Sequence, residues 1–401
     1  MKKIYYGKAV YNHKEIKAVN KVLRNNRLNL IDGPHVKKLE KIILKKFGKK
    51  YGLMVNSGSS ANLLALSSFN FKKGSEIITT SLTFSTTVAP IYQLGLIPHF
   101  IGVLENKFVA DTSQIEDCIN KKTVAIMIPN LLGNIPNWKE INRIAKKYKL
   151  KVIEDSADTI GYKINNKINS NNSDVVTNSF YASHIVNGAG FGGIVCFNNN
   201  YLYKKAKLLR GWGRSSAIFN ESERIEDRFN VKISGIQYDK KYIFSGLGYN
   251  FLPSEISAAF ALEQLKKLNS NISIRKKNFN YLFRFFSKYS NYFKLPETFK
   301  NVKTPWLAFP LVIKKNKKFN RMQLQIFLEK NNIQTRTIFT GNILRQPLMK
   351  NLKYKKHPNS EKIADDVMEN GILIGCHQGL KINDLIYIFS IFKKFAKIKK
   401  L

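Results

Sequence analysis

Short apolar segments of strand-like composition alternate with helical patterns along most of the chain, and this alternation restricts the folds open to it. Strands are expected at residues 53–55, 76–80, 97–103, 124–129, 151–154, 174–180 and 194–197. Stretches with helical spacing separate them, such as the predicted helix over residues 60–68. Strands that alternate with helices assemble into a mostly parallel sheet with helices on both faces. The sequence therefore predicts an α/β fold.

Helical patterns also flank this region. Helices are expected over residues 13–23 and 36–47, separated by the chain-breaking pair Gly33-Pro34. The C-terminal predictions are a helix over 254–265, a second helix from near 274, a strand at 307–312, a helix at 321–331 and a closing helix from 382. A length of 401 residues suits two domains. We expect an N-terminal arm and large domain over 1–265, a smaller α+β domain over 266–401, and a purely polar loop at 165–173.

Composition argues against several classes of protein. No apolar run of 18 residues is present and no apolar signal core follows Met1, so we expect no membrane association. The three cysteines are odd in number and widely spaced, which suits a reducing cytoplasm and provides no metal-site spacing. The net charge of +40 is spread along the chain without a nucleic-acid-binding module. We interpret it as a general compositional bias and expect no nucleic-acid partner.

An anion-binding loop is predicted at residues 56–62. This segment, Asn-Ser-Gly-Ser-Ser-Ala-Asn, follows a predicted strand and opens a helix. The small residues Gly58, Ser59 and Ser60 let the backbone approach an anion, and the helix N-terminus adds positive potential. An ordinary serine-rich helix cap is the alternative interpretation.

Three further side chains follow predicted strands in an order that suits a cofactor site. Phe84 can lie against a flat heterocycle, although a core phenylalanine is the alternative. Asp155 ends an apolar run, where a carboxylate points into the crevice that binds ligands in α/β sheets; a helix cap is the alternative. His184 lies between Ser179 and a glycine-rich run at 188–193, and its imidazole can carry a proton near neutral pH, unless it is only structural.

Taken together, this order resembles the fold-type I pyridoxal-phosphate (PLP) enzymes, and nearly the whole chain resembles the sugar aminotransferase family (DegT/DnrJ/EryC1/StrS). The resemblance implies the PLP-dependent transferase fold type I, with a mostly parallel seven-stranded sheet. It also implies a role for each candidate cofactor residue: phosphate contacts for Gly58, Ser59, Ser60 and Ser179, ring stacking for Phe84, pairing with the ring nitrogen for Asp155, and a place near the ring hydroxyl for Asp158, where glutamine is usual. Residues 248–251 resemble the segment that crosses a homodimer interface, with Asn250 reaching the partner's cofactor phosphate. Apart from the resemblance, Asn250 is a turn residue before the helix that is expected from residue 254.

His184 occupies the position of the lysine that holds the cofactor covalently in that family. No lysine lies between Lys167 and Lys204 that could replace it. The chain resembles one branch of the family, the sugar 3-dehydratases, in this histidine and in residues 56–64, 334–337, 341–342 and 374–380. These enzymes make 3,6-dideoxyhexoses from nucleotide-linked 4-keto-6-deoxy sugars. The resemblance implies PLP or pyridoxamine phosphate (PMP) bound without a covalent link, and a dehydration in which His184 is the base. We expect Arg336 to contact the sugar or a phosphate; a surface arginine is the alternative.

Members of this branch either carry a [2Fe-2S] cluster and use a reductase, or lack the cluster and regenerate the cofactor from glutamate, as in GDP-4-keto-6-deoxymannose 3-dehydratase. The cluster needs four thiolates, several of them soon after a Trp-Gly-Arg sequence. Here residues 212–214 are followed by Ser215 and Ser216, and the chain has three cysteines. The cluster-free, glutamate-dependent type is therefore expected, without an iron–sulfur cluster. One departure is that Gly192-Gly193 comes one residue later than in the family pattern, without the usual glutamate.

Three alternatives to this function stay open. They are a reductase-coupled dehydratase, a nucleotide-sugar 4-aminotransferase with an unrecognised base, and a non-catalytic sensor that kept the fold. Retention of Asp155, Phe84 and the phosphate-loop serines favours an enzyme, because a scaffold has no need of an electron sink.

Overall fold

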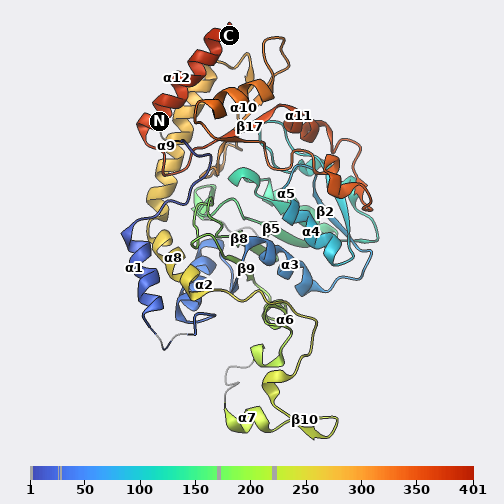
Figure 1. Cartoon of the computed structure of the whole chain (residues 1–401). Coiled ribbons are helices and arrows are strands. Elements are labelled where there is room, and N and C mark those ends of the chain that lie inside the picture. The colour runs from blue at the N-terminus through green and yellow to red at the C-terminus, as the bar shows by residue number, and fades with distance from the viewer. Residues whose placement is uncertain (1–2, 26, 28, 169–172, 219–223) are drawn as a thin grey trace.

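The computed structural model describes residues 3–25, 27, 29–168, 173–218 and 224–401. Its centre is an eight-stranded sheet in the order β1-β9-β8-β5-β4-β2-β3-β16 (Figure 1). Neighbouring strands from β8 to β16 run parallel, whereas β9 is antiparallel to both β8 and β1. The strands are β1 (Tyr51–Val55), β2 (Glu76–Thr80), β3 (Ile97–Ile101), β4 (Thr123–Pro129), β5 (Lys151–Asp155), β8 (Val175–Ser179), β9 (Gly193–Phe197) and the two-residue edge strand β16 (Lys355–Lys356).

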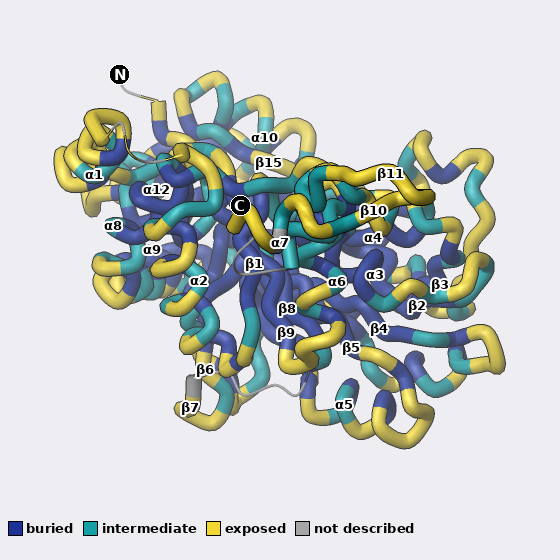
Figure 2. The backbone as a smooth tube through the Cα atoms, turned by 90° about the horizontal axis from the view of Figure 1, so that it is seen from below, coloured by how far each residue is buried: buried dark blue, intermediate teal, exposed yellow. Residues whose placement is uncertain are grey.

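Helices cover both faces of this sheet because successive strand residues point to opposite sides. In β4, Ile126 and Ile128 pack with α2 (Pro34–Phe47), α5 (Trp138–Lys147) and α8 (Glu255–Lys266). Ala125 and Met127 face the other side, where α3 (Gly58–Phe69), α4 (Ser85–Gln93) and α6 (Asn200–Arg210) pack. The mostly parallel, doubly covered sheet expected from the sequence is thus confirmed. Figure 2 shows these strands as the buried interior of the molecule.

A second, antiparallel sheet follows α8 in the order β12-β14-β17-β15. Its strands are β12 (Phe293–Lys294), β14 (Phe309–Ile313), β15 (Thr335–Arg336) and β17 (Gly371–Ile374). An aromatic-rich core joins it to α9 (Leu268–Ser287), α10 (Arg321–Lys330), α11 (Lys362–Asn370) and α12 (Ile382–Ile398). The chain's first described residues reach this part, since Ile4 forms a β-bridge with Ile333. They then lead to α1 (His13–Leu23), which packs against α8.

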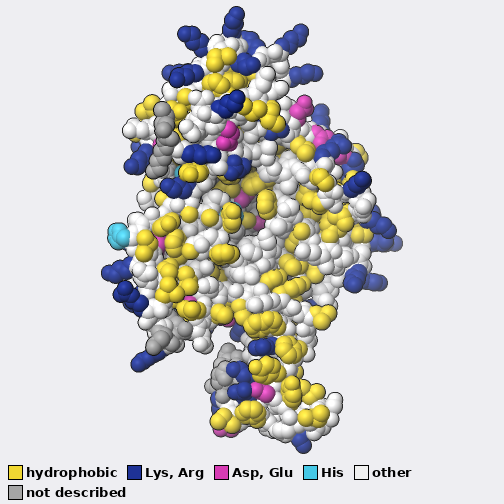
Figure 3. Space-filling view, viewed as in Figure 1, with side chains coloured by type: hydrophobic (Ala, Val, Ile, Leu, Met, Phe, Trp, Pro, Cys, Tyr) yellow, Lys and Arg dark blue, Asp and Glu magenta, His cyan; other side chains and the backbone are white. Residues whose placement is uncertain are grey.

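A projecting segment, residues 211–218 and 224–248, lies between α6 and α8 and extends away from the body (Figure 1). It contains α7 (Ile225–Phe229) and the hairpin of β10 (Lys232–Ile233) and β11 (Ile236–Gln237). Its described side chains include several exposed apolar ones, and Leu247 is 98% exposed. Figure 3 shows hydrophobic side chains gathered on this segment, while Lys and Arg are spread around the body.

Two local expectations were wrong. Residues 165–173 are not purely a loop, because β6 (Lys163–Ile164) pairs with β7 (Lys167–Ile168) and β13 (Val302–Lys303) adds a third strand. Asn165 and Asn166 adopt the positive φ angles of a tight turn, which asparagine tolerates; residues 169–172 lie outside the described part. The second C-terminal helix begins at Leu268 rather than near 274, directly after α8. Among the described helices, none combines the length and apolarity needed to cross a bilayer.

Candidate active site

A cavity of about 940 Å³ lies where the carboxyl ends of the central strands meet the C-terminal part of the chain. The large sheet contributes Asp155 and Ser179, and the C-terminal part contributes Arg336 and Phe339. Parallel α/β sheets bind ligands at this edge. Of the predicted site residues, those that line the cavity are Gly58, Ser59, Phe84, Asp155, Asp158, Ser179, His184 and Arg336.

The N-terminus of α3 forms one end of the cavity. Ser57 caps the helix and accepts a hydrogen bond from the Ser60 amide at 3.0 Å. A Cβ at Gly58 would lie 2.6 Å from the Cβ of Ser179, so only glycine allows the helix to approach β8 this closely. First-turn amides and the helix dipole then face the cavity, which is a suitable cradle for a phosphate.

The structure separates Ser60 from the other predicted phosphate residues. Its hydroxyl lies 2.9 Å from the Ser57 hydroxyl, and Ser60 does not line the cavity. Ser57 does line it, so the cap and the cavity wall share this side chain.

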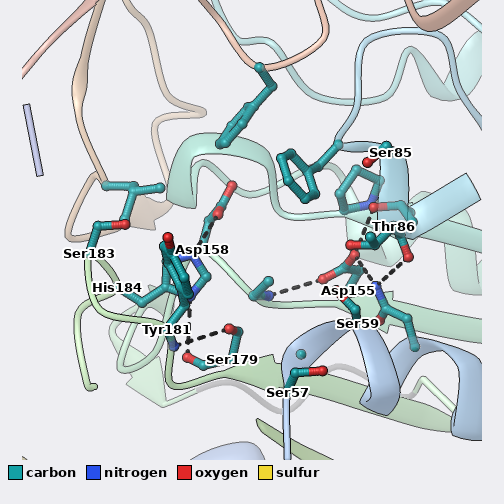
Figure 4. A pocket seen from close by; sticks show the side chains of 18 of the residues that line it. Ser57, Ser59, Ser85, Thr86, Asp155, Asp158, Ser179, Tyr181, Ser183 and His184 are labelled. Atoms are coloured by element: carbon teal, nitrogen blue, oxygen red, sulfur yellow. Dashed lines mark hydrogen bonds and ion pairs between the residues drawn. The ribbon is translucent and has the colours of Figure 1, made fainter. Parts of the chain in front are cut away.

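Asp155 stands at the C-terminal end of β5 in the floor of the cavity (Figure 4). Its Oδ2 accepts hydrogen bonds from Asn62 Nδ2 and Thr87 Oγ1, each at 2.8 Å, and its Oδ1 accepts from the Ala157 amide at 3.1 Å. Burial raises its pKa, and these hydrogen bonds oppose the rise. Among the described residues no cationic side chain contributes to its charge state. The floor of the cavity therefore suits a ligand that brings its own positive charge.

Phe84 precedes α4, and its ring borders the cavity with 49% of the residue exposed. The edge contact with Phe339, at 5.9 Å between ring centroids, orients the ring. A large apolar side chain is normally buried, so the exposed ring provides a surface for a flat ligand.

His184 lies in the turn after β8 and faces the cavity with 14% of its side chain exposed (Figure 4). Its Nδ1 is 3.4 Å from the carbonyl oxygen of Ser179, a weak contact that orients the ring and leaves Nε2 toward the cavity. Burial, with a smaller contribution from the Arg275 cation, lowers the pKa of His184 to about 4. The imidazole is therefore neutral at pH 7 and can accept a proton.

Asp158 lies opposite His184. Its Oδ2 accepts a hydrogen bond from the Leu132 amide at 2.8 Å, and its Oδ1 lies 3.8 Å from His184 Nε2. Burial, helped by the Asp155 charge, raises the pKa of Asp158 to about 8. Asp158 therefore holds a proton at neutral pH.

Two predicted residues lie farther from this centre. Arg336 on β15 lines the cavity, with its guanidinium 5.9 Å from the centroid of the Tyr6 ring. Asn250 is exposed and does not line the cavity of its own chain. Its carbonyl oxygen accepts a long hydrogen bond from Asn56 Nδ2, at 3.4 Å.

Several lining residues were not predicted. Asn62 ends the predicted anion-binding loop and Thr87 follows Phe84 by three residues, but only their contacts with Asp155 identify them. Tyr6 and Leu348 line the cavity from distant parts of the chain without a local motif that marks them, whereas Tyr181 lies in the segment between Ser179 and His184.

Comparison with known proteins places this geometry in context. The model of the DegT/DnrJ/EryC1/StrS aminotransferase family matches residues 10–393. Lipopolysaccharide biosynthesis protein RfbH of Salmonella typhimurium is 36% identical over 366 residues, covering 88% of this chain and 83% of RfbH. The GDP-4-keto-6-deoxy-D-mannose 3-dehydratase of Escherichia coli O55:H7 is 32% identical over 389 residues, covering 94% of this chain and 96% of that protein.

Solved structures show the same likeness. The E. coli GDP-4-keto-6-deoxy-D-mannose-3-dehydratase with bound hydrated PLP superposes with a TM-score of 0.84 and 30% identity, covering 98% of this chain and 99% of that one. A histidine-to-asparagine variant of this dehydratase, with bound GDP-perosamine, has a TM-score of 0.84 and 30% identity over 97% and 99% of the two chains. A third structure, with a trapped PLP–glutamate geminal diamine, has a TM-score of 0.83 and 30% identity over the same shares.

Proposed function

The chain belongs to the DegT/DnrJ/EryC1/StrS aminotransferase family, and from this membership we propose that it is a PLP- and PMP-dependent 3-dehydratase. Its substrate is a nucleotide-linked 4-keto-6-deoxy sugar, from which it removes the C3 hydroxyl. The likeness to the lipopolysaccharide protein RfbH and to GDP-4-keto-6-deoxy-D-mannose 3-dehydratase supports a role in making deoxysugars for surface polysaccharides.

One observation carries this proposal. His184 occupies the cavity wall, and no lysine lines the cavity in the described part of the chain. Imidazole cannot hold the cofactor covalently, but it can transfer a proton. An enzyme whose cofactor cavity is lined by a histidine and by no lysine is suited to elimination rather than to ordinary transamination.

The cavity fits the cofactor on features of this chain alone. The close approach of Gly58 to Ser179 leaves an anion cradle for the phosphate. The exposed Phe84 ring provides a stacking surface. Asp155, buried without a cationic partner among the described side chains, would hold a proton at the pyridine nitrogen. When bound, the cofactor supplies an electron sink conjugated with the substrate.

The protein's own part in the reaction is proton handling and positioning. His184 is the base, because its neutral ring presents Nε2 to the cavity. The apolar side chains of Phe339, Leu348 and Leu373 border the same cavity and limit access of water. Arg336 contacts the sugar or a phosphate of the substrate. Glutamate is the amino donor, in line with the glutamate adduct trapped in a structural neighbour.

The active unit is a homodimer with shared sites. Two features support this proposal: Asn250 lies outside the cavity of its own chain, and the neighbouring projecting segment exposes apolar side chains that a second copy would cover. Asn250 then reaches the partner's cofactor phosphate. We also propose that the large domain covers residues 1–265 and the small domain residues 266–401.

The reaction needs no iron–sulfur cluster in this proposal. The chain has three cysteines, and Cys118, Cys196 and Cys376 are all buried. No described group of histidine, cysteine or acidic residues has the arrangement of a metal site.

Incubation of the purified protein with PMP, glutamate and a panel of nucleotide-linked 4-keto-6-deoxy sugars tests this function. Mass spectrometry should detect a sugar that has lost one oxygen atom and gained no nitrogen, without any added reductase. Borohydride should leave no cofactor attached to the protein. A 4-amino sugar as the main product, or a pyridoxyl-lysine adduct, would replace the proposal with an aminotransferase.

A further inference from the structure

The pair of Asp158 and His184 differs from a carboxylate that merely orients a histidine. The nearest approach is 3.8 Å from Asp158 Oδ1 to His184 Nε2, the ring nitrogen that faces the cavity. The other ring nitrogen is near the Ser179 carbonyl oxygen. Asp158 therefore faces the atom that accepts protons. Glutamine, the usual residue at this position, carries no exchangeable acid proton there.

The backbone holds Asp158 in this place. The Leu132 amide donates to Asp158 Oδ2 at 2.8 Å, while the Leu307 amide donates to the Leu132 carbonyl oxygen at 2.8 Å. Leu132 adopts a positive φ of 58°, a conformation that leucine rarely adopts and that the surrounding contacts must support. One oxygen of Asp158 is thus occupied, and the other is left toward His184 and the cavity.

The charged surroundings disfavour an isolated charge on either partner. The other ionisable groups around the pair are Asp155 on β5, Tyr181 in the turn after β8, Tyr6 in the N-terminal segment, Arg275 on α9 and Arg336 on β15. Asp155 opposes ionisation of Asp158, and Arg275 opposes protonation of His184. Burial acts in the same two directions and is the larger effect on each group. At neutral pH the pair therefore consists of a neutral carboxyl group beside a neutral imidazole.

We propose that Asp158 is the proton partner of His184, so that the two side chains form an acid–base pair that exchanges protons without a net change of charge. In dehydration, His184 Nε2 accepts one proton as a carbon–hydrogen bond breaks. Asp158 gives one proton to the departing hydroxide, which leaves as water. A proton then passes from His184 to the Asp158 carboxylate and restores the starting state. This use of the pair rests on the proposed function, whereas the pairing itself does not.

NMR on cofactor-free protein tests the pairing without any activity. The chain has six histidines, so ¹³Cε1 labelling gives few signals, and the His184→Asn variant identifies the one that belongs to His184. We expect this signal to shift in two steps, one below pH 5 from the ring itself and one near pH 8 from ionisation of Asp158. In Asp158→Asn and Asp158→Gln the upper step should vanish and the lower step should remain.

Two controls belong to this measurement. His377 is buried and hydrogen-bonded to the Tyr5 carbonyl, and its signal should show only a low-pH step in every variant, which also reports that the fold is intact. Asp155→Asn should keep the upper step of His184 but move it to lower pH, because the opposing charge is lost. Absence of the upper step in the wild-type protein, or its persistence in Asp158→Asn, would overturn the pairing.

The pH profile of dehydration tests whether the reaction uses the pair of Asp158 and His184. Wild-type kcat/KM should fall above pH 8 as Asp158 loses its proton. The Asp158→Asn variant should be at least about tenfold slower and lack this limb. If the Asp158→Asn variant dehydrates the sugar at the normal rate and its kcat/KM still falls above pH 8, the inference is wrong, while the proposed function is unaffected. If no preparation dehydrates any sugar, the proposed function fails, and the NMR result still decides the pairing.

Discussion

We propose that His184 stands where other family members carry a cofactor-binding lysine, so that an imidazole able to exchange a proton takes the place of that amine. Its position after β8 is part of a local motif, but its neutral state results from burial, with a smaller contribution from the Arg275 cation. With a pKa of about 4, the imidazole stays neutral and able to accept a proton over the whole neutral range.

Replacement of His184 should remove dehydration while leaving the fold intact. We expect His184→Asn to bind PMP but to lose at least about a hundredfold in kcat, the usual effect of a positioned general base. His184→Lys should also dehydrate more slowly and form some 4-amino sugar, since lysine can bind the cofactor covalently. Steady-state rates and product masses measure both effects. The matched control is His357→Asn, which changes a histidine outside the cavity; a wild-type rate in His184→Asn would make this histidine structural.

His377 should make the protein less stable in mild acid. Burial lowers its folded pKa to about 4, below the value of about 6.5 expected for an unfolded chain. Between these values the unfolded chain binds a proton that the folded chain does not, so stability is lost as pH falls through this window. From pH 7.5 to 5 the loss is about 2 kcal/mol for this side chain.

Denaturant unfolding of wild type and His377→Gln at the two pH values measures that difference. Glutamine can still hydrogen-bond the Tyr5 carbonyl, so the variant should fold and show a smaller pH dependence. An equal pH dependence in the two proteins would contradict the assignment.

At the scale of elements, the N-terminus of α3 depends on its approach to β8. Gly58→Ala places a Cβ 2.6 Å from that of Ser179, so the helix start must move and the phosphate cradle must open. We expect at least a tenfold weaker affinity for PMP and a loss of about 1–3 kcal/mol in stability. Absorbance titration and chemical unfolding measure these changes.

Gly211→Ala, at the C-terminal end of α6, is the matched control for Gly58→Ala. Its added Cβ would meet Leu252 and Ala217 at ordinary contact distances of 3.9 and 4.0 Å. Cofactor affinity should stay unchanged there. Equal losses in both variants would show that the effect is general to glycine replacement and not specific to the cradle.

The elements also show where sequence patterns are reliable. The central strands were predicted because buried parallel strands are continuous apolar runs. The polar hairpin of β6 and β7 and the hairpin of β10 and β11 were missed, because two-residue strands have no periodicity to detect. The division after residue 265 stays a prediction.

At the scale of the whole molecule, a shared active site should allow two inactive variants to complement each other. His184→Asn lacks the base, and Asn250→Ala lacks the contact proposed to reach the partner's phosphate. A hybrid dimer contains one site with both changes and one with neither. Mixed and re-equilibrated variants should therefore recover up to a quarter of wild-type activity, on the order expected for random pairing.

Sedimentation analysis accompanies that experiment, and each variant re-equilibrated alone is its control. A protein that stays monomeric while it binds cofactor fully would contradict the dimer proposal. So would a mixture no more active than its parts.

The sequence by itself determined the α/β class, the order of the site residues and the histidine in place of lysine, because each of these is a local pattern of a few neighbouring residues. Only the tertiary structure decided which side chains share the cavity. Asn62 and Thr87 lie 93 and 68 residues from Asp155 and yet hold its carboxylate, and Ser60 turns to Ser57 instead of the cavity. The proximity of Asp158 to His184 and the burial that sets their protonation depend on how β5, β8 and the backbone at Leu132 pack. Such contacts arise from the packing of distant elements, and no local pattern encodes them.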